Sequence, residues 1–140
     1  MNDSNPSGAT PKNMFLASVE RCLASDRFIP TFYERFTGAS EEIKFKFRHT
    51  DFEKQYVRLK NALLMCAKAT ANEPGAIADL AERARTHDRD HLNIKPALYD
   101  IWLTLIIDTA RDFDPEWNPA TEAAWKLILG HAVTYMSNRY

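Results

Sequence analysis

Helical periodicity runs through nearly all of this sequence and constrains its fold more than any other feature. Apolar residues recur at three- and four-residue steps, as at Ile77, Leu80 and Ala84, with His87 next on the same stripe. This spacing places side chains on one face of an α-helix. No segment shows the alternation of apolar and polar residues that marks a half-buried strand. The sequence therefore predicts an all-α protein of six or seven helices.

Helix boundaries follow from caps, prolines and glycines. Thr10 before Pro11 has the pattern of an N-cap and a first helical residue. Thr50 followed by Glu53 has the pattern of a capping box. The predicted segments are residues 11–24, 25–38, a short turn within 40–47, 50–71, 76–91, 96–111 and a last helix from 118.

The length favours a single domain. A chain of 140 residues with 45% hydrophobic residues can bury a sizeable core but is too short for two domains of ordinary size. Residues 1–10 are rich in Ser, Asn, Pro and Gly and hold too few apolar side chains to offset the entropy lost on folding. We expect a disordered tail over residues 1–10 and a folded domain over residues 11–140.

Charge and cysteine content restrict the partners and the compartment. The chain has 18 Lys and Arg against 19 Asp and Glu, so its net charge of -1 gives no overall attraction to nucleic acid or an anionic membrane. The apolar stretch at 101–107 is too short to span a bilayer, and no signal peptide is evident. Cys22 and Cys66 lack CxxC spacing and suit buried thiols in a reducing compartment. We expect a cytoplasmic protein without nucleic-acid or membrane partners.

Three polar residues interrupt faces that should be apolar, namely Tyr33, Gln55 and His87. A buried imidazole, phenol or amide needs a partner, and for His87 this is either a backbone carbonyl or a metal centre. The sequence has no Gly-rich phosphate loop and no GxSxG, HExxH or CxxC motif. Three such residues in one helical chain point to a shared pocket.

The order of several residues along the chain matches a known family. The second predicted helix reads FY-x-R-F, Phe47 precedes a polar corner, and Gln55 and Leu59 lie in the long helix. His87 is then followed by Leu-x-Ile-x-Pro-x-x-Tyr, which ends at Tyr99. With these residues the chain resembles bacterial single-domain globins, and it is most similar to the haem domain of flavohaemoglobins over residues 14–136. The resemblance implies a globin fold packed around haem b.

The resemblance also implies a role for each matching residue. His87 corresponds to the proximal ligand, the protein side chain that binds the haem iron. On the opposite, distal side, Tyr33 and Gln55 correspond to the tyrosine and glutamine that donate hydrogen bonds to a bound gas. The residues expected to line the haem are Phe47, Leu59, Leu80, His87 and Tyr99.

Two departures from the family pattern leave alternatives open. His87 lies further from Pro96 than is usual in flavohaemoglobins, whereas His91 lies nearer, so His91 is a second candidate for the proximal ligand. His49 is a weaker third candidate. The glutamate that accompanies the proximal-side tyrosine in flavohaemoglobins is missing, and Tyr140 stands at about that place.

The resemblance implies a protein that binds O2, CO and NO reversibly at a haem iron. Oxidation of nitric oxide to nitrate would require an external electron donor or reductase, because the sequence ends at Tyr140, where a flavohaemoglobin continues into its reductase domains. An alternative function is a haem-based gas or redox sensor that signals through a partner or a dimer contact. A third is a haem-free helical domain used for interaction.

Overall fold

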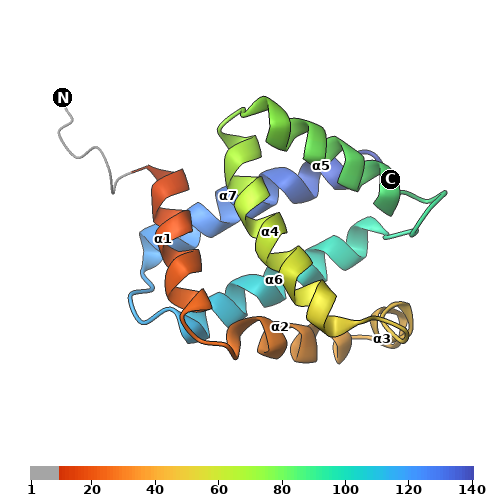
Figure 1. The fold of residues 1–140 in the computed structure, drawn as a ribbon, viewed down its shortest axis with the longest axis horizontal. Helices are drawn as coiled ribbons and strands as arrows, with labels where there is room; N and C mark the ends of the chain where they lie inside the picture. Colours follow the sequence, from red (N-terminus) through yellow and green to blue (C-terminus); the bar gives the residue numbers. More distant parts are fainter. Residues whose placement is uncertain (1–9) are drawn as a thin grey trace.

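The computed structural model describes residues 10–140, which form seven α-helices and no β-strand (Figure 1). The predicted all-α fold class is therefore confirmed. Of the expected tail, only Thr10 belongs to the described residues, and residues 1–9 lie outside them. The helices are α1 (Pro11–Leu23), α2 (Phe28–Thr37), α3 (Glu41–Lys46), α4 (Phe52–Thr70), α5 (Pro74–His87), α6 (Pro96–Phe113) and α7 (Pro119–Ser137).

Side-chain caps define the starts of several helices. Thr10 caps α1 by accepting a hydrogen bond from the Asn13 backbone N–H at 3.1 Å, as its sequence pattern predicted. The predicted capping box at Thr50 is wrong by one residue. Asp51 caps α4 instead, and its Oδ1 accepts from the backbone N–H groups of Glu53 and Lys54. A carboxylate serves this position well because it also interacts favourably with the positive end of the helix dipole.

Helix α5 is shorter and rotated relative to the sequence prediction. It begins at Pro74 and ends at His87, whereas the periodicity predicted residues 76–91. Its buried face consists of Ala76, Leu80 and Ala84, and Ile77 is 40% exposed. Ile77 lies about 100° around the helix from Ala76, because consecutive residues of an α-helix turn by that angle. The prediction of Ile77 on the buried stripe was therefore wrong.

The packing of the helices leaves α5 apart from α6. Helix α7 contacts α1, α4, α5 and α6, and α2 packs on α6 and α3. Helix α5 packs against α4 and α7 but has at most marginal contact with α6. Figure 1 shows α5 and α6 diverging from the loop 88–95 that joins them. Helix α5 is therefore held in place by α4 and α7.

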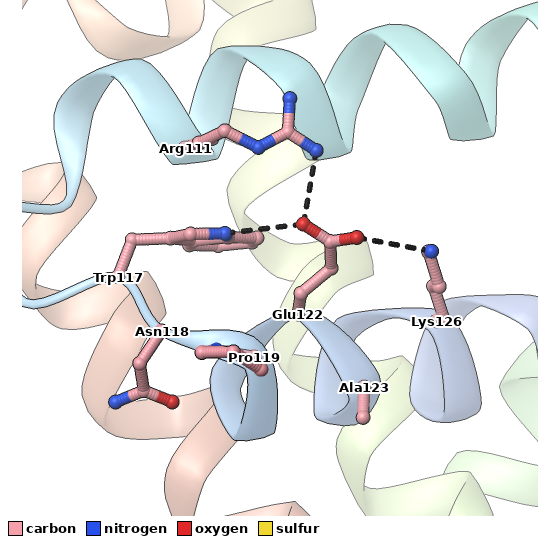
Figure 2. A pocket seen from close by; sticks show the side chains of 7 residues that line it. All are labelled: Arg111, Trp117, Asn118, Pro119, Glu122, Ala123 and Lys126. Carbon is pink, nitrogen blue, oxygen red and sulfur yellow. Dashed lines mark hydrogen bonds and ion pairs between the residues drawn. The ribbon is translucent and has the colours of Figure 1, made fainter.

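A carboxylate joins the end of α6 to the start of α7 (Figure 2). Glu122 accepts hydrogen bonds from Arg111 Nη2 at 3.0 Å and Trp117 Nε1 at 3.3 Å, and pairs with Lys126 Nζ at 3.0 Å. Together Lys126, Arg111 and Trp117 lower the pKa of Glu122 to about 2. Both carboxylate oxygens of Glu122 therefore have partners within this surface network.

A second polar network is buried between α1 and the α6–α7 loop. Asp114, 4% exposed, accepts hydrogen bonds from Ser18 Oγ at 2.6 Å, Arg21 Nε at 2.6 Å and the Glu116 backbone N–H at 2.8 Å. Trp125 Nε1 in turn donates to Ser18 Oγ at 2.9 Å. We refer to Ser18, Arg21, Asp114 and Trp125 as the Asp114 network. It ties α1 to the α6–α7 loop and to α7, which follow it by more than ninety residues in the sequence.

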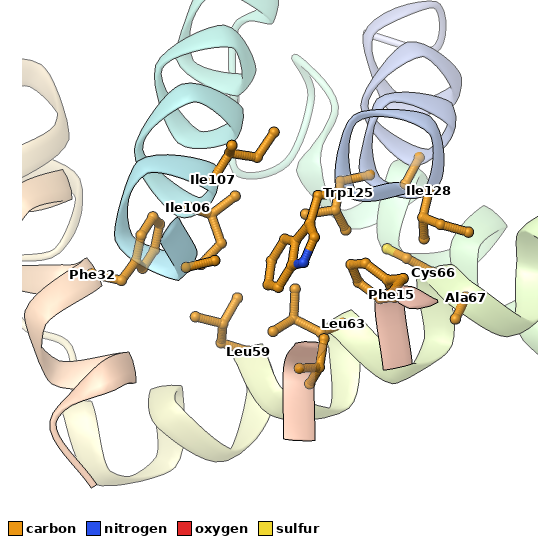
Figure 3. Packing of buried hydrophobic residues seen from close by; sticks show 14 of the residues in the cluster. Phe15, Phe32, Leu59, Leu63, Cys66, Ala67, Ile106, Ile107, Trp125 and Ile128 are labelled. Carbon is orange, nitrogen blue, oxygen red and sulfur yellow. The ribbon is translucent and has the colours of Figure 1, made fainter. Parts of the chain in front are cut away.

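The apolar core surrounds Trp125, as Figure 3 shows. Its indole ring meets the ring of Phe15 edge to face, with centroids 4.8 Å apart. Leu63 and Ile106 are fully buried in the same cluster. Cys22 and Cys66 are both buried free thiols, as the sequence predicted.

Candidate functional site

Tyr33 and Gln55 meet between α2 and α4. Tyr33 is 4% exposed, and its hydroxyl oxygen accepts a hydrogen bond from Gln55 Nε2 at 3.0 Å. Because the amide uses the oxygen as an acceptor, the phenolic hydrogen can point elsewhere. Burial raises the pKa of Tyr33 to about 12, so the phenol remains protonated at neutral pH. The pair therefore presents a hydrogen-bond donor in an apolar setting.

Aromatic rings enclose this pair. The ring of Tyr33 lies 5.8 Å from Phe47, 5.7 Å from Phe52 and 5.8 Å from Tyr56, measured between centroids. Phe47 and Phe52 stack on each other at 6.2 Å with an interplanar angle of 20°. Phe47 is the C-cap of α3, so the corner before α4 brings its ring against Tyr33. The ring of Tyr33 is thus surrounded by flat aromatic side chains.

Leu59 lies one helical turn after Gln55 and therefore on the same side of α4. It is 4% exposed and belongs to the core cluster, near Phe32 and Ile106 in Figure 3. The structure thus brings four predicted site residues into one region, namely Tyr33, Phe47, Gln55 and Leu59.

His87 is the last residue of α5 and is half-buried. Its Nδ1 lies 2.6 Å from the carbonyl oxygen of Arg83 and 3.1 Å from Thr86 Oγ1. A ring nitrogen beside a carbonyl carries the hydrogen, so the other nitrogen, Nε2, has the lone pair. Within residues 10–140, no protein group forms a hydrogen bond with Nε2. Burial lowers the pKa of His87, which favours the neutral imidazole that binds metals.

The rival histidines have different surroundings. His91 lies in the turn after α5, 46% exposed, and its Nδ1 pairs with Asp88 Oδ1 at 2.7 Å. His49, in the corner before α4, is exposed. Among the described residues, neither ring has a backbone carbonyl partner such as His87 has in Arg83. The local geometry favours His87 over both as a metal ligand.

Leu80 and Tyr99 flank His87 in the sequence and are both buried. Leu80, 2% exposed, lies on the α5 face that packs on α4. Tyr99, 8% exposed, lies in the first turn of α6, and burial raises its pKa to about 12. No hydrogen bond or ring contact between described residues joins His87 or Tyr99 to Tyr33. The structure therefore brings the residues expected on the distal side into contact with one another. It shows no such contact, among the described residues, between them and the residues expected on the proximal side.

Tyr140 holds the loop that follows His87. Its backbone carbonyl accepts from the Arg89 backbone N–H at 3.0 Å and from Arg89 Nε at 3.3 Å, and its hydroxyl donates to Asn93 Oδ1. Asn93 adopts a φ of 55°, and the next residue's N–H bonds back to the carbonyl of His87 at 2.9 Å. The sequence suggested only that Tyr140 replaces a glutamate. Its contacts with the loop join residues far apart in the chain and carry no local pattern.

Surface depressions elsewhere do not include these residues. One, of about 440 Å³, is the α6–α7 corner of Figure 2, and another, of about 570 Å³, follows the outer face of α7. Among residues 10–140, no group of three His, Cys, Asp or Glu side chains could hold a metal ion. No helix in this range is long and apolar enough to cross a membrane.

Comparison with known proteins decides the family, since a family model described as Globin matches residues 21–136. The chain belongs to the globin family. This globin is also similar to a solved protein from Pseudomonas aeruginosa PAO1 that is described as structurally highly homologous to a human hemoglobin. The two share 26% sequence identity with a TM-score of 0.89, over 94% of this chain and 98% of that chain. No curated protein matches the sequence.

The two matches confirm the predicted resemblance to bacterial single-domain globins. Globins generally bind haem and diatomic gases, so the family supports the predicted class of cofactor and ligand. Within this globin, His87 ends the helix that precedes Pro96, and Tyr33 and Gln55 lie on α2 and α4. Both groups belong to the region covered by the family match.

Proposed function

We propose that this globin binds haem b between α4, α5 and α6 and uses it to bind O2, CO and NO reversibly. The observation that carries the proposal is the orientation of His87. Its Nδ1 is held by the Arg83 carbonyl at 2.6 Å, which leaves Nε2 as a neutral ligand without a protein partner among the described residues. Such a carbonyl contact fixes the ring orientation of metal-binding histidines.

The residues present suit this cofactor. A lone histidine supplies one ligand to a metal, and a porphyrin supplies four more. The flat macrocycle requires apolar and aromatic walls, which Phe47, Leu59, Leu80 and Tyr99 provide on three different helices and the corner before α4. Helix α5 packs on α4 and α7 rather than on α6, an arrangement compatible with a planar group beside His87. When bound, haem supplies an iron centre for gas binding and one-electron chemistry.

Tyr33 and Gln55 polarise the bound gas. Gln55 donates to the Tyr33 oxygen, so the protonated phenol has its own hydrogen to donate to a bound gas. A hydrogen bond to a charged or strongly polarised group contributes about 1.5 to 3 kcal/mol, which slows dissociation by roughly ten- to hundredfold. We therefore propose slow oxygen release.

We further propose that bound O2 oxidises nitric oxide to nitrate, with both of its oxygen atoms passing to NO, and that an external donor would supply the electron that returns the iron to the ferrous state. Tyr33 and Gln55 serve as the positioning and donating residues for this reaction. The buried free thiols Cys22 and Cys66 are compatible with the reducing cytoplasm as its location.

One observation favours a second candidate function, a gas sensor. Tyr140 connects the end of the chain after α7 with the loop that follows His87. A shift of His87 on ligand binding would reach α7 through this contact.

Optical spectroscopy and gas consumption test these proposals. We expect the purified protein with haem to show a Soret band that shifts on reduction and again on adding O2 or CO. A protein that binds no haem would contradict the proposed function. With a reductase supplied, repeated consumption of nitric oxide by the oxygen-bound form supports the enzyme, whereas a change in oligomeric state on ligation without turnover supports the sensor.

A further inference from the structure

Positive charge is concentrated in one short part of the chain. Residues 43–60 contain six Lys and Arg residues but only two acidic ones, while the whole chain has a net charge of -1. We call these six side chains the basic face, and they are Lys44, Lys46, Arg48, Lys54, Arg58 and Lys60. All are exposed except Lys46, which is half-buried.

The basic face lacks the carboxylate partners that other cations have. Within residues 10–140, none of its six members forms an ion pair. Eight of the other twelve Lys and Arg residues do, namely Lys12, Arg21, Arg35, Arg83, Arg85, Lys95, Arg111 and Lys126. The charge on this face is therefore not compensated by the protein.

The contacts that the basic face does make leave its charge in place. Arg48 donates to the Phe45 carbonyl at 2.7 Å and lies 3.5 Å above the Phe45 ring. Lys46 donates to the Leu92 carbonyl, and Arg58 donates to Gln55 Oε1, each at 3.4 Å. All three acceptors are neutral.

Charges four residues apart are of opposite sign on α5 and α7 but of the same sign on α4. On α5, Asp79 pairs with Arg83 four residues later, and on α7 Glu122 pairs with Lys126. The same four-residue step on α4 places Lys54 beside Arg58, a like-charged pair that weakens a helix slightly. A face that keeps like charges together is suited to an acidic partner.

The basic face borders the distal side of the site. It occupies α3, the following corner and the first half of α4, which lie together at one end of the molecule in Figure 1. The stacked rings of Phe47 and Phe52 lie between these segments. Two apolar side chains are exposed among the cations, Phe45 at 61% and Val57 at 57%. Exposed apolar side chains in the same region as cations are a combination found in protein interfaces.

We propose that the basic face is the docking site for an acidic one-electron carrier protein that reduces the haem. This inference rests on the proposed function, since it names the surface through which the electron donor acts. In the transfer the cofactor of the carrier loses one electron, and ferric iron gains it to become ferrous. A protein partner fits better than a polyanion such as nucleic acid, because Asp51 and Glu53 interrupt the cations and the chain is negatively charged overall.

The test uses the haem-loaded globin and a flavodoxin, an acidic carrier protein, as the probe. The charge-reversal variant is Lys44→Glu/Lys54→Glu. The matched control is Arg27→Glu/Lys68→Glu, which changes two exposed unpaired cations outside the basic face and therefore alters net charge equally. Calorimetry measures binding of flavodoxin, and stopped-flow absorbance measures reduction of the ferric haem.

We expect binding and reduction by flavodoxin to weaken about tenfold between low salt and about 300 mM salt. At low salt, the charge-reversal variant should weaken both by about tenfold and the control by less than about twofold. Reduction by dithionite at high salt should be the same in all three proteins. Equal losses in the variant and the control, or no binding of flavodoxin, would overturn the proposal.

Further outcomes separate this inference from the proposed function. Absence of a haem spectrum would contradict the proposed function, and with it the electron-donor role of the face. A normal haem spectrum without salt-dependent flavodoxin binding would overturn the docking site alone. Tighter binding of duplex DNA or anionic vesicles through Lys44 and Lys54 would also overturn it, because the face would then serve a different partner.

Discussion

The Asp114 network and the candidate haem site handle buried polar groups in opposite ways. In the Asp114 network, the carboxylate takes hydrogen bonds from two side chains and a backbone N–H, and Trp125 completes the set through Ser18. At the candidate site, His87 and Tyr33 each use one polar atom on a protein partner. The imidazole Nε2 and the phenolic hydrogen remain available for something else.

This difference distinguishes a structural network from a binding site. A buried polar group costs stability unless its hydrogen bonds are made, so a fully paired network stabilises the fold in the absence of any ligand. A buried group with one hydrogen bond unmade can form that bond with a ligand, and only in the direction of its unused atom. The predictions below change each region in turn, beginning with the largest expected effect.

Removing the charge of Asp114 should have the largest effect on stability. Asp114→Asn leaves the half-buried Arg21 without its carboxylate, and loss of one partner of a buried ion pair costs about 3 to 5 kcal/mol. The free energy of unfolding measured in urea should fall by about 3 kcal/mol. Asp108→Asn, which breaks an exposed pair with Arg111, should cost less than about 1 kcal/mol. Equal losses of unfolding free energy in the two variants would mean that the Asp114 network stabilises the fold no more than an exposed ion pair does.

Removing the Tyr33 hydroxyl should affect ligand release and leave the fold largely intact. Tyr33→Phe should speed oxygen dissociation by roughly ten- to hundredfold, because a hydrogen bond worth about 1.5 to 3 kcal/mol is lost. Flash photolysis or stopped-flow displacement measures this rate. Tyr56→Phe is the matched control, since its ring lies 5.8 Å from Tyr33 in the same cluster. An unchanged rate in Tyr33→Phe, or an equal change in Tyr56→Phe, would remove Tyr33 from the distal pocket.

Loosening the loop after His87 should have a smaller effect. Tyr140→Phe removes the hydrogen bond to Asn93, and such a bond contributes about 1 kcal/mol. Amide hydrogen exchange in residues 89–94 should become faster, with little change in α1. Tyr135→Phe, whose ring packs under Arg139 instead, serves as the control. Unchanged exchange in the loop of Tyr140→Phe would show that the contact does not hold it.

Acid should remove the contribution of Asp114 gradually. Burial opposes its ionisation, but hydrogen bonds from Arg21 and Ser18 outweigh burial and hold the pKa of Asp114 below its usual value. The stabilisation is therefore complete above the unfolded pKa of about 3.9 and is lost as pH falls through the lower folded pKa. The difference in unfolding free energy between the native protein and Asp114→Asn should shrink over that range. A difference independent of pH would contradict this cause.

The all-α fold was predictable because each helix carries its own spacing, caps and prolines. The proximity of Tyr33 and Gln55 was also predictable, since each interrupts an apolar stripe, whereas their distal role stays a prediction. The rotation of α5 was not, because Ile77 and Ala76 are both apolar and only packing on α4 selects Ala76. The burial of Asp114 was missed for a related reason. An aspartate in a loop is usually exposed, and its partners Ser18 and Arg21 lie over ninety residues away.

The ferrous spectrum of the haem-loaded protein tests the central claim most directly. Native protein and His91→Ala should both give the five-coordinate, histidine-ligated ferrous spectrum and bind CO, because the Nε2 of His87 is available in both. His87→Ala should lose that spectrum, and added imidazole should restore it. Loss of the spectrum in His91→Ala and its retention in His87→Ala would contradict the account and transfer the ligand role to the turn after α5.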